Sequence, residues 1–182
     1  MSDFEELISK IKDKDIEAFE KLVLSVERDL YRIAQTRLDN VEDIEDAIQE
    51  TMIVAFNSIE DLNSFQYFRA WIIKILINEC NHIYKKNNRF SRLHKKLSLD
   101  KEEYNYGEIY ELEHKIELEK VLSFLNYDDR LCITLFYNEH YSINEIAQIL
   151  DENANTVKSR ITRAKKKIRK YYDGGVESEK RK

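Results

Sequence analysis

The feature that most constrains this chain is the scarcity of residues that make tight turns. Its 182 residues include no proline and three glycines, Gly107, Gly174 and Gly175. β-Sandwiches and barrels need many tight turns, which usually contain glycine or proline, so a mainly helical fold is favoured. The same scarcity excludes the glycine-rich phosphate-binding loops of nucleotide-binding enzymes and the glycine-flanked serine of hydrolases.

Apolar residues recur at helical spacing along most of the chain, and the pattern fails only around residues 87–112 and after residue 172. We therefore expect an all-α protein with two small helical domains, 1–88 and 114–172. A flexible linker, 89–113, joins them, and the tail, 173–182, is expected to be disordered. The spacing predicts one long helix over about 19–38 and another over about 65–86. Asn40, Asn126 and the pair Ser142 and Glu145 are predicted to cap helices.

Charged residues gather in blocks of alternating sign that the net charge of −5 conceals. Residues 39–61 hold eight acidic and no basic side chains, and residues 82–96 hold six basic and no acidic ones. Residues 97–119 hold eight acidic side chains and two lysines, and residues 153–172 hold eight basic and no acidic ones. Segregated surfaces of this kind suit different partners. Because the last block contains no acid that pairs with its basic residues, it favours binding to nucleic-acid phosphates.

The last basic block follows a short helix and a three-residue polar turn, which is the spacing of a helix–turn–helix. In that motif the second helix enters the major groove of DNA. With Val157, Ile161, Ala164 and Ile168 inward, the predicted outer face carries these residues: Thr156, Lys158, Ser159, Arg160, Thr162 and Arg163. Arginine can bond guanine through two hydrogen bonds, and hydroxyls and lysine suit phosphates.

The helix predicted over 65–86 has a second, mostly polar face, formed by Trp71, Lys74, Asn78, His82 and Lys85. An aromatic plane beside amide and cationic groups suits stacking on unpaired bases and hydrogen bonding to them. Composition alone favours a simpler alternative, in which Trp71 lies in the core and the other four residues form a solvated stripe.

Two sets of motifs resemble the sigma-70 family of transcription initiation factors. Region 2 of that family resembles three segments here: Asp46-Ala-Ile-Gln-Glu50, Phe68-Arg-Ala-Trp71 and Asn78. Region 4 resembles three more: Leu122 to Leu125, Ser142-Ile-Asn-Glu-Ile-Ala147 and Thr156-Val-Lys-Ser-Arg160. With only these two regions and a short linker, the chain is similar to the extracytoplasmic-function (ECF) sigma factors.

The resemblance implies a role for each segment. Asp46, Gln49 and Glu50 would contact the coiled coil of the RNA polymerase clamp. Leu62 and Asn78, with Trp71 nearby, would take a flipped base from the melted −10 element. Leu62 stands where the family usually has an aromatic residue. The last helix would read the −35 element, and the acidic linker would thread the RNA channel of the polymerase.

We therefore expect a promoter-recognition and promoter-melting subunit of bacterial RNA polymerase that is not an enzyme. Its expected partners are core polymerase, promoter DNA and, as is usual in the family, an anti-sigma factor. The alternative is a free-standing helix–turn–helix regulator whose N-terminal half senses a signal or dimerises. The acidic helix and the face around Trp71 and Asn78 distinguish the two, because such a regulator needs neither.

No cofactor, metal site or membrane insertion is expected. Cys80 and Cys132 lie on apolar stripes, where cysteine is usually a small core residue, and the four histidines lack the spacing of metal ligands. The longest apolar run, residues 70–77, is too short to span a bilayer, and the N-terminus lacks the order of a signal peptide. These features predict a cytoplasmic protein.

Overall fold

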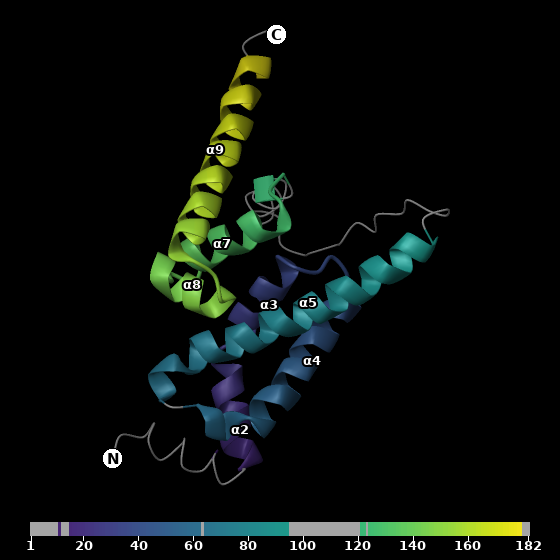
Figure 1. The fold of residues 1–182 in the computed structure, drawn as a ribbon, viewed down its shortest axis with the longest axis vertical. Coiled ribbons are helices and arrows are strands. Elements are labelled where there is room, and N and C mark those ends of the chain that lie inside the picture. The colour runs from purple at the N-terminus through teal and green to yellow at the C-terminus, as the bar shows by residue number, and fades with distance from the viewer. Residues whose placement is uncertain (1–10, 12–14, 63, 95–120, 123, 180–182) are drawn as a thin grey trace.

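The structure is a computed structural model that describes residues 11, 15–62, 64–94, 121–122 and 124–179 (Figure 1). Within these ranges the chain is all-α, as predicted, and contains no strand. The elements are, in order: α2 (Ile16–Leu24), α3 (Glu27–Gln35), α4 (Val41–Asn57), the 3-10 turns η1 (Ile59–Asp61) and η2 (Phe65–Tyr67), α5 (Phe68–His94), α7 (Tyr127–Tyr137), α8 (Ile143–Leu150) and α9 (Ala154–Glu179).

The helix predicted over 19–38 is in fact two helices, because the chain turns at Ser25 and Val26. The Ser25 hydroxyl donates to the carbonyl oxygen of Leu22 at 2.6 Å, which satisfies a backbone acceptor where α2 ends. Val26 then leaves helical geometry, with φ −120° and ψ −3°. The apolar spacing continues across this break, so periodicity alone does not detect it.

The helix predicted over 65–86 begins later and ends later than expected. It begins at Phe68, after the turn η2, and runs to His94, into the segment predicted to be linker. Neither proline nor glycine stops it, and the Asn87 amide donates to Asp43 of α4 at 2.7 Å. The remaining linker, 95–113, lies outside the described residues.

The predicted caps of the other helices are confirmed. Asn40 accepts from the Glu42 backbone N–H at 2.9 Å, and Asn126 accepts from that of Asp129 at 2.8 Å. Ser142 and Glu145 form the expected capping box. These bonds satisfy N–H groups that have no partner within the first turn of a helix.

Helix α9 is longer than predicted and continues to Glu179, through part of the tail for which the sequence predicts disorder. Gly174 and Gly175 do not adopt a positive φ, so they do not form the left-handed turn with which glycine commonly ends a helix.

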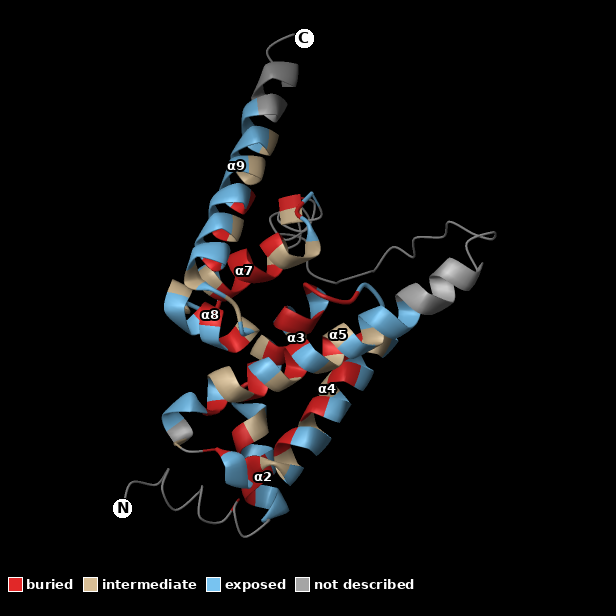
Figure 2. Cartoon of the chain, viewed as in Figure 1, coloured by how far each residue is buried: buried red, intermediate tan, exposed pale blue. Residues whose placement is uncertain are grey.

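The two helical groups, α2–α5 and α7–α9, pack against each other rather than standing apart (Figures 1 and 2). Helix α5 contacts α3 and α4 of its own group and α8 of the other. Along α5, Ile72, Leu76 and Cys80 are fully buried, and so is Ile73 on a neighbouring face, where Ile77 is also buried. One hydrophobic core therefore includes residues of both groups.

Candidate nucleic-acid interface

Helix α4 carries the acidic surface. Asp46, Gln49 and Glu50 are exposed, while Ala47 and Thr51 are fully buried on the opposite side. Asp46 and Glu50 make no ion pair with the described residues, so their charges face solvent. Two large apolar residues on the same helix, Ile53 and Val54, are also exposed, at 47% and 37% of their surface. We refer to Asp46, Gln49, Glu50, Ile53 and Val54 as the α4 face.

Exposed apolar residues beside unpaired acids are typical of a protein-binding surface. The sequence analysis missed Ile53 and Val54. The helical period contains this signal for Ile53, which lies away from the stripe of buried residues, whereas Val54 follows the buried Thr51 by three residues and lies at the edge of that stripe.

Helix α5 exposes four of the six residues predicted to contact the −10 element. Lys74, Asn78, His82 and Lys85 are exposed along one face, which we call the α5 face. Trp71 lies at the start of this face, partly buried, with its ring tilted against another aromatic ring of the core. His82 Nδ1 lies 3.6 Å from the Glu79 carboxylate, one turn earlier. The face is therefore polar and cationic, with one aromatic edge.

Leu62 does not join this face. It is only 5% exposed and belongs to the hydrophobic core, between the turn η1 and the start of α5. Burial of an aliphatic side chain is favourable, which accounts for the inward packing of Leu62. In this arrangement the predicted base contact of Leu62 is not on the surface.

Helix α9 presents Thr156, Lys158, Ser159 and Thr162 to solvent, as predicted. An open pocket on this helix is lined by these residues: Lys158, Ser159, Thr162, Arg163 and Lys166. Three cations and two hydroxyls in one hollow form a set of donors suited to phosphate oxygens and base edges. Lys166 was not among the predicted site residues, although it follows Thr162 by one helical turn.

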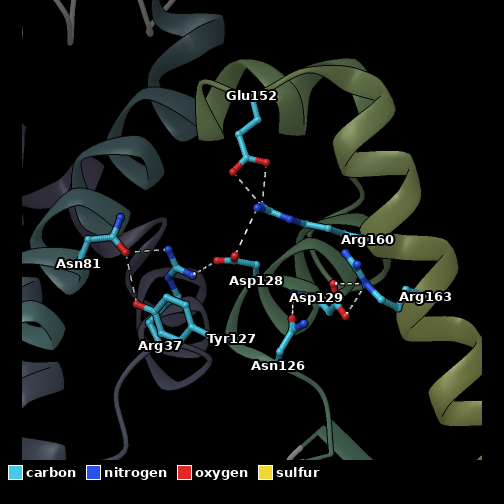
Figure 3. Close-up of polar contacts among 9 residues, drawn as sticks. All are labelled: Arg37, Asn81, Asn126, Tyr127, Asp128, Asp129, Glu152, Arg160 and Arg163. Atoms are coloured by element: carbon cyan, nitrogen blue, oxygen red, sulfur yellow. Dashed lines mark hydrogen bonds and ion pairs between the residues drawn. The ribbon is translucent and has the colours of Figure 1, made fainter. Parts of the chain in front are cut away.

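Arg160, in contrast, is not on the outer face (Figure 3). Its guanidinium lies 2.7 Å from the Glu152 carboxylate and 3.2 Å from that of Asp128, and its side chain is 17% exposed. Burial alone would lower the pKa of Arg160, but the two carboxylates outweigh it and the pKa is raised. Arg160 follows the buried Val157 by three residues, so both lie on the side that faces α7 and α8.

Arg163 is also paired, although half of its side chain remains exposed. Its Nε lies 3.1 Å from both carboxylate oxygens of Asp129, and Lys167 lies 3.6 Å from the same carboxylate. The prediction from the sequence that the basic block has no acidic partners holds only within that block. Asp128 and Asp129 of α7 and Glu152 of the turn before α9 supply the partners.

Two polar clusters connect the helical groups. In the first, Arg37 contacts Asn81 at 2.8 Å and Asp128 at 3.5 Å, and the Tyr127 ring lies beneath its guanidinium (Figure 3). Arg37 is a buried cation at the end of α3, and burial lowers its pKa. Because Asp128 also pairs with Arg160, this cluster continues to the basic helix.

The second cluster surrounds Glu139, in the turn between α7 and α8, whose side chain is 0% exposed. Arg32 and Arg69 of the other group lie 2.9 Å and 2.8 Å from its carboxylate. Both arginines also pair with Asp29, at 2.6 Å and 2.7 Å. Burial raises the pKa of Glu139, an effect that Arg32 and Arg69 offset only in part. The sequence analysis missed both clusters.

Thiol chemistry, metal binding and membrane insertion receive little support from the described residues. Burial raises the thiol pKa of Cys80 to about 12 and that of Cys132 to about 11, so both are unreactive at neutral pH. In the part of the chain that the structure describes, no group of His, Cys, Asp or Glu side chains could hold a metal ion. No described helix is long and apolar enough to cross a membrane.

Two parts of the chain match known protein-family patterns. The sigma-70 region 2 pattern matches residues 22–90, and the sigma-70 region 4 pattern matches residues 115–168. The chain is 30% identical to the RNA polymerase sigma factor SigV of Bacillus subtilis over 78% of this chain and 83% of that protein. It is also 30% identical to the ECF RNA polymerase sigma-E factor of Haemophilus influenzae over 89% and 91% of the two chains.

The chain belongs to the sigma-70 family, in its ECF group. It is therefore a sigma factor for transcription initiation and not a free-standing regulator. Sigma factors are initiation factors rather than enzymes. The motifs quoted from both regions lie within the residues that these patterns match.

The fold of this ECF sigma factor is also that of solved structures. It resembles the sigma factor RpoE of Bartonella quintana, solved with the anti-sigma factor NepR, with a TM-score of 0.71 and 23% identity over 87% of this chain and 98% of that one. It resembles CnrH, solved with the cytosolic domain of CnrY, with a TM-score of 0.67 and 23% identity over 92% and 96% of the chains.

Proposed function

We propose that this sigma factor binds core RNA polymerase through the α4 face, the −10 element through the α5 face and the −35 element through α9. The observation that carries the proposal is the separation of one acidic surface from two basic ones. The unpaired acids of the α4 face repel DNA and attract a basic protein surface, whereas the α5 face and the outer side of α9 attract DNA. Each of these surfaces is exposed.

The α4 face is the polymerase-docking surface in this proposal. Asp46 and Glu50 supply charge that steers the encounter, and Ile53 and Val54 supply apolar area that is covered on binding. Gln49 follows Asp46 by three residues and can donate or accept hydrogen bonds at the interface.

The α5 face is the surface for the melted −10 strand. Lys74 and Lys85 are placed to meet phosphates, and Asn78 is placed to bond the edge of an unpaired base. Trp71, at one end, supplies an aromatic surface on which a base can stack. Leu62 supports this site from the core instead of contacting the base.

The outer side of α9 is the surface for the −35 duplex. Lys158, Ser159 and Thr162 are free to contact DNA, and Lys166 lies one turn further along for a phosphate. Arg160 holds the helix in place through Asp128 and Glu152 and does not read bases. Arg163 is intermediate, because it pairs with Asp129 yet lines the same pocket.

An anti-sigma factor is a further proposed partner. The support is the similarity of fold to RpoE, which was solved with its anti-sigma factor NepR. The proposed site of action is the cytoplasm, where promoter DNA and core polymerase are found in bacteria.

Transcription reconstituted from core polymerase and a linear promoter fragment tests the proposal. The purified chain should convert core polymerase into an enzyme that melts the −10 element, detected as permanganate-reactive thymines. Core polymerase alone is the control. Binding of the chain to duplex DNA without any recruitment of core polymerase would contradict the proposal.

A further inference from the structure

Tyr127, the first residue of α7, inserts its ring into a polar site on the other helical group. The ring stacks on Tyr84 of α5, with 4.8 Å between ring centroids and 22° between planes. The Arg37 guanidinium lies over the same ring, 3.6 Å from its centroid. The phenol hydroxyl donates to Asn81 Oδ1 at 3.3 Å (Figure 3).

This set of contacts is the one that proteins use for an unpaired nucleobase. Single-stranded nucleic acids bind by stacking bases on aromatic rings and on arginine planes, and side-chain amides bond the exposed base edges. The Arg37 guanidinium also donates to Asn81 Oδ1, at 2.8 Å, which fixes the orientation of the amide. Among the described residues nothing accepts from the amide nitrogen of Asn81, so one base-bonding group remains available.

The site also lies beside the predicted path of the melted strand. Asn81 follows Asn78 by three residues, so the two amides are neighbours on the surface of α5. Tyr84 follows Asn81 by three more residues and lies next to Lys85 of the α5 face. In the packed arrangement Tyr127 covers the site, and the Arg37 side chain is only 5% exposed.

We propose that Arg37, Asn81 and Tyr84 form a binding site for an unpaired base of single-stranded DNA, and that Tyr127 occupies this site as a base mimic while the two helical groups are packed together. This inference rests on the proposed function, because it assumes a melted strand beside the α5 face. It adds a second base site to the one assigned to Asn78.

Promoter binding requires Tyr127 to leave the proposed base-binding site. The names of the −35 and −10 elements place them about 25 base pairs apart, which is about 85 Å of B-form DNA. Helix α8 contacts both α5 and α9, and these two helices, of 27 and 26 residues, are each only about 40 Å long. The packed arrangement cannot reach both elements, so α7 must separate from α5, and that separation withdraws Tyr127 from the site.

Binding of single-stranded DNA to the free full-length chain tests the proposal. The probe is a fluorescent 12-nucleotide strand of mixed sequence containing one 5-iodouracil, at fixed ionic strength. Tyr127→Ala should bind it about tenfold more tightly than the unsubstituted chain, because the site is vacated. Tyr127→Phe should remain near the unsubstituted chain, since its ring still stacks. Tyr172→Ala, a change at an exposed tyrosine of α9, is the matched control and should have no effect.

The double variant Tyr127→Ala/Tyr84→Ala separates base binding from simple opening. Both variants lack the Tyr127 ring, but only Tyr127→Ala keeps the Tyr84 ring on which a base can stack. The tenfold gain in affinity for single-stranded DNA should therefore disappear in the double variant. Photocrosslinking should attach 5-iodouracil to Tyr84 in the single variant only. Equal gains in the two variants, or no gain in Tyr127→Ala, would overturn the proposal. Reconstituted transcription by the unsubstituted chain tests the proposed function separately, because that assay does not measure binding of single-stranded DNA to the free protein.

Discussion

The region 2 half and the region 4 half of this sigma factor place their charges differently. On α4, Asp43 accepts a hydrogen bond from Asn87, but Asp46 and Glu50 face solvent without an ion pair in the described structure, so this part of the charge block corresponds to a charged surface. On α9 the block is divided: Arg160, Arg163 and Lys167 pair with acids from α7 and the turn before α9, whereas Lys158 and Lys166 line the open pocket on the outer side. A run of like charges in a sequence therefore does not identify a binding surface by itself. Only those charged residues that neighbouring helices leave unpaired can form one.

The largest expected effect tests whether the unpaired acids of α4 are the docking surface. The double variant Asp46→Lys/Glu50→Lys should weaken binding to core polymerase by at least about 100-fold, because it replaces attraction with repulsion at the interface. Affinity is measured by titrating labelled core polymerase. The variant Glu17→Lys/Glu20→Lys makes the same charge change on exposed positions of α2 and should bind normally. Equal losses in both variants would show that only net charge matters.

The second effect tests the buried cluster that joins the halves. Arg69→Ala removes one of the two cations beside the buried Glu139 carboxylate. Arg32 still contacts the carboxylate, and the loss of one hydrogen bond to a charged group costs about 1.5–3 kcal/mol, so the packed arrangement should give way to an open one. X-ray scattering should show a larger radius of gyration at neutral pH. Arg28→Ala, at an exposed arginine of α3, should leave the radius unchanged.

The same variant should respond to pH in a defined direction. Burial raises the pKa of Glu139 above its ordinary value of 4.5, so the packed state favours the protonated form. Packing in Arg69→Ala should therefore recover as the pH falls and be lost as the pH rises through the raised pKa. Arg69→Ala/Glu139→Gln should stay packed at all pH values. An open double variant at low pH would exclude Glu139 as the cause.

These clusters mark the limit of what the sequence predicts. The caps at Asn40, Asn126 and Ser142 were predictable because each donor and acceptor lie within three residues of each other. Arg37 and Asp128 are 91 residues apart, and Arg69 and Glu139 are 70 apart, so no local pattern connects them.

One signal of the packing was nonetheless present in the sequence. Residues 70–77 of α5 are apolar on nearly every side, which is more than one inward stripe requires. The excess, Ile73 and Ile77, is buried in the core that the two halves share. On the α4 face, Asp46, Gln49 and Glu50 are exposed as the period of one helix predicts, whereas the exposed Ile53 and Val54 were missed.

The third effect tests whether the α5 face acts on melted DNA. Asn78→Ala should reduce open-complex formation about tenfold while closed-complex binding changes little, because the proposed partner of the amide is an unpaired base. A flipped base costs a few kcal/mol, and one lost recognition bond removes about 1–3 kcal/mol of the compensation. Permanganate reactivity at equal promoter occupancy measures this step. Asn57→Ala, at an exposed asparagine of α4, is the control. Unchanged melting would remove Asn78 from the site.

The smallest effect sharpens the division of α9 into paired and free cations. Lys158→Ala should weaken binding to a −35 duplex about three- to tenfold and reduce the salt slope by about one unit, because a free cation that neutralises one phosphate releases one counterion. Arg160→Ala should leave the salt slope unchanged, since its charge is already neutralised by Glu152 and Asp128. It should instead lower the thermal stability of the chain, because two carboxylates lose their partner. Affinity at several salt concentrations and a melting curve for each variant separate the two outcomes. A salt slope that falls equally in both variants would mean that Arg160 leaves its ion pairs to meet DNA, and the division of α9 seen in the packed structure would not apply to the bound state.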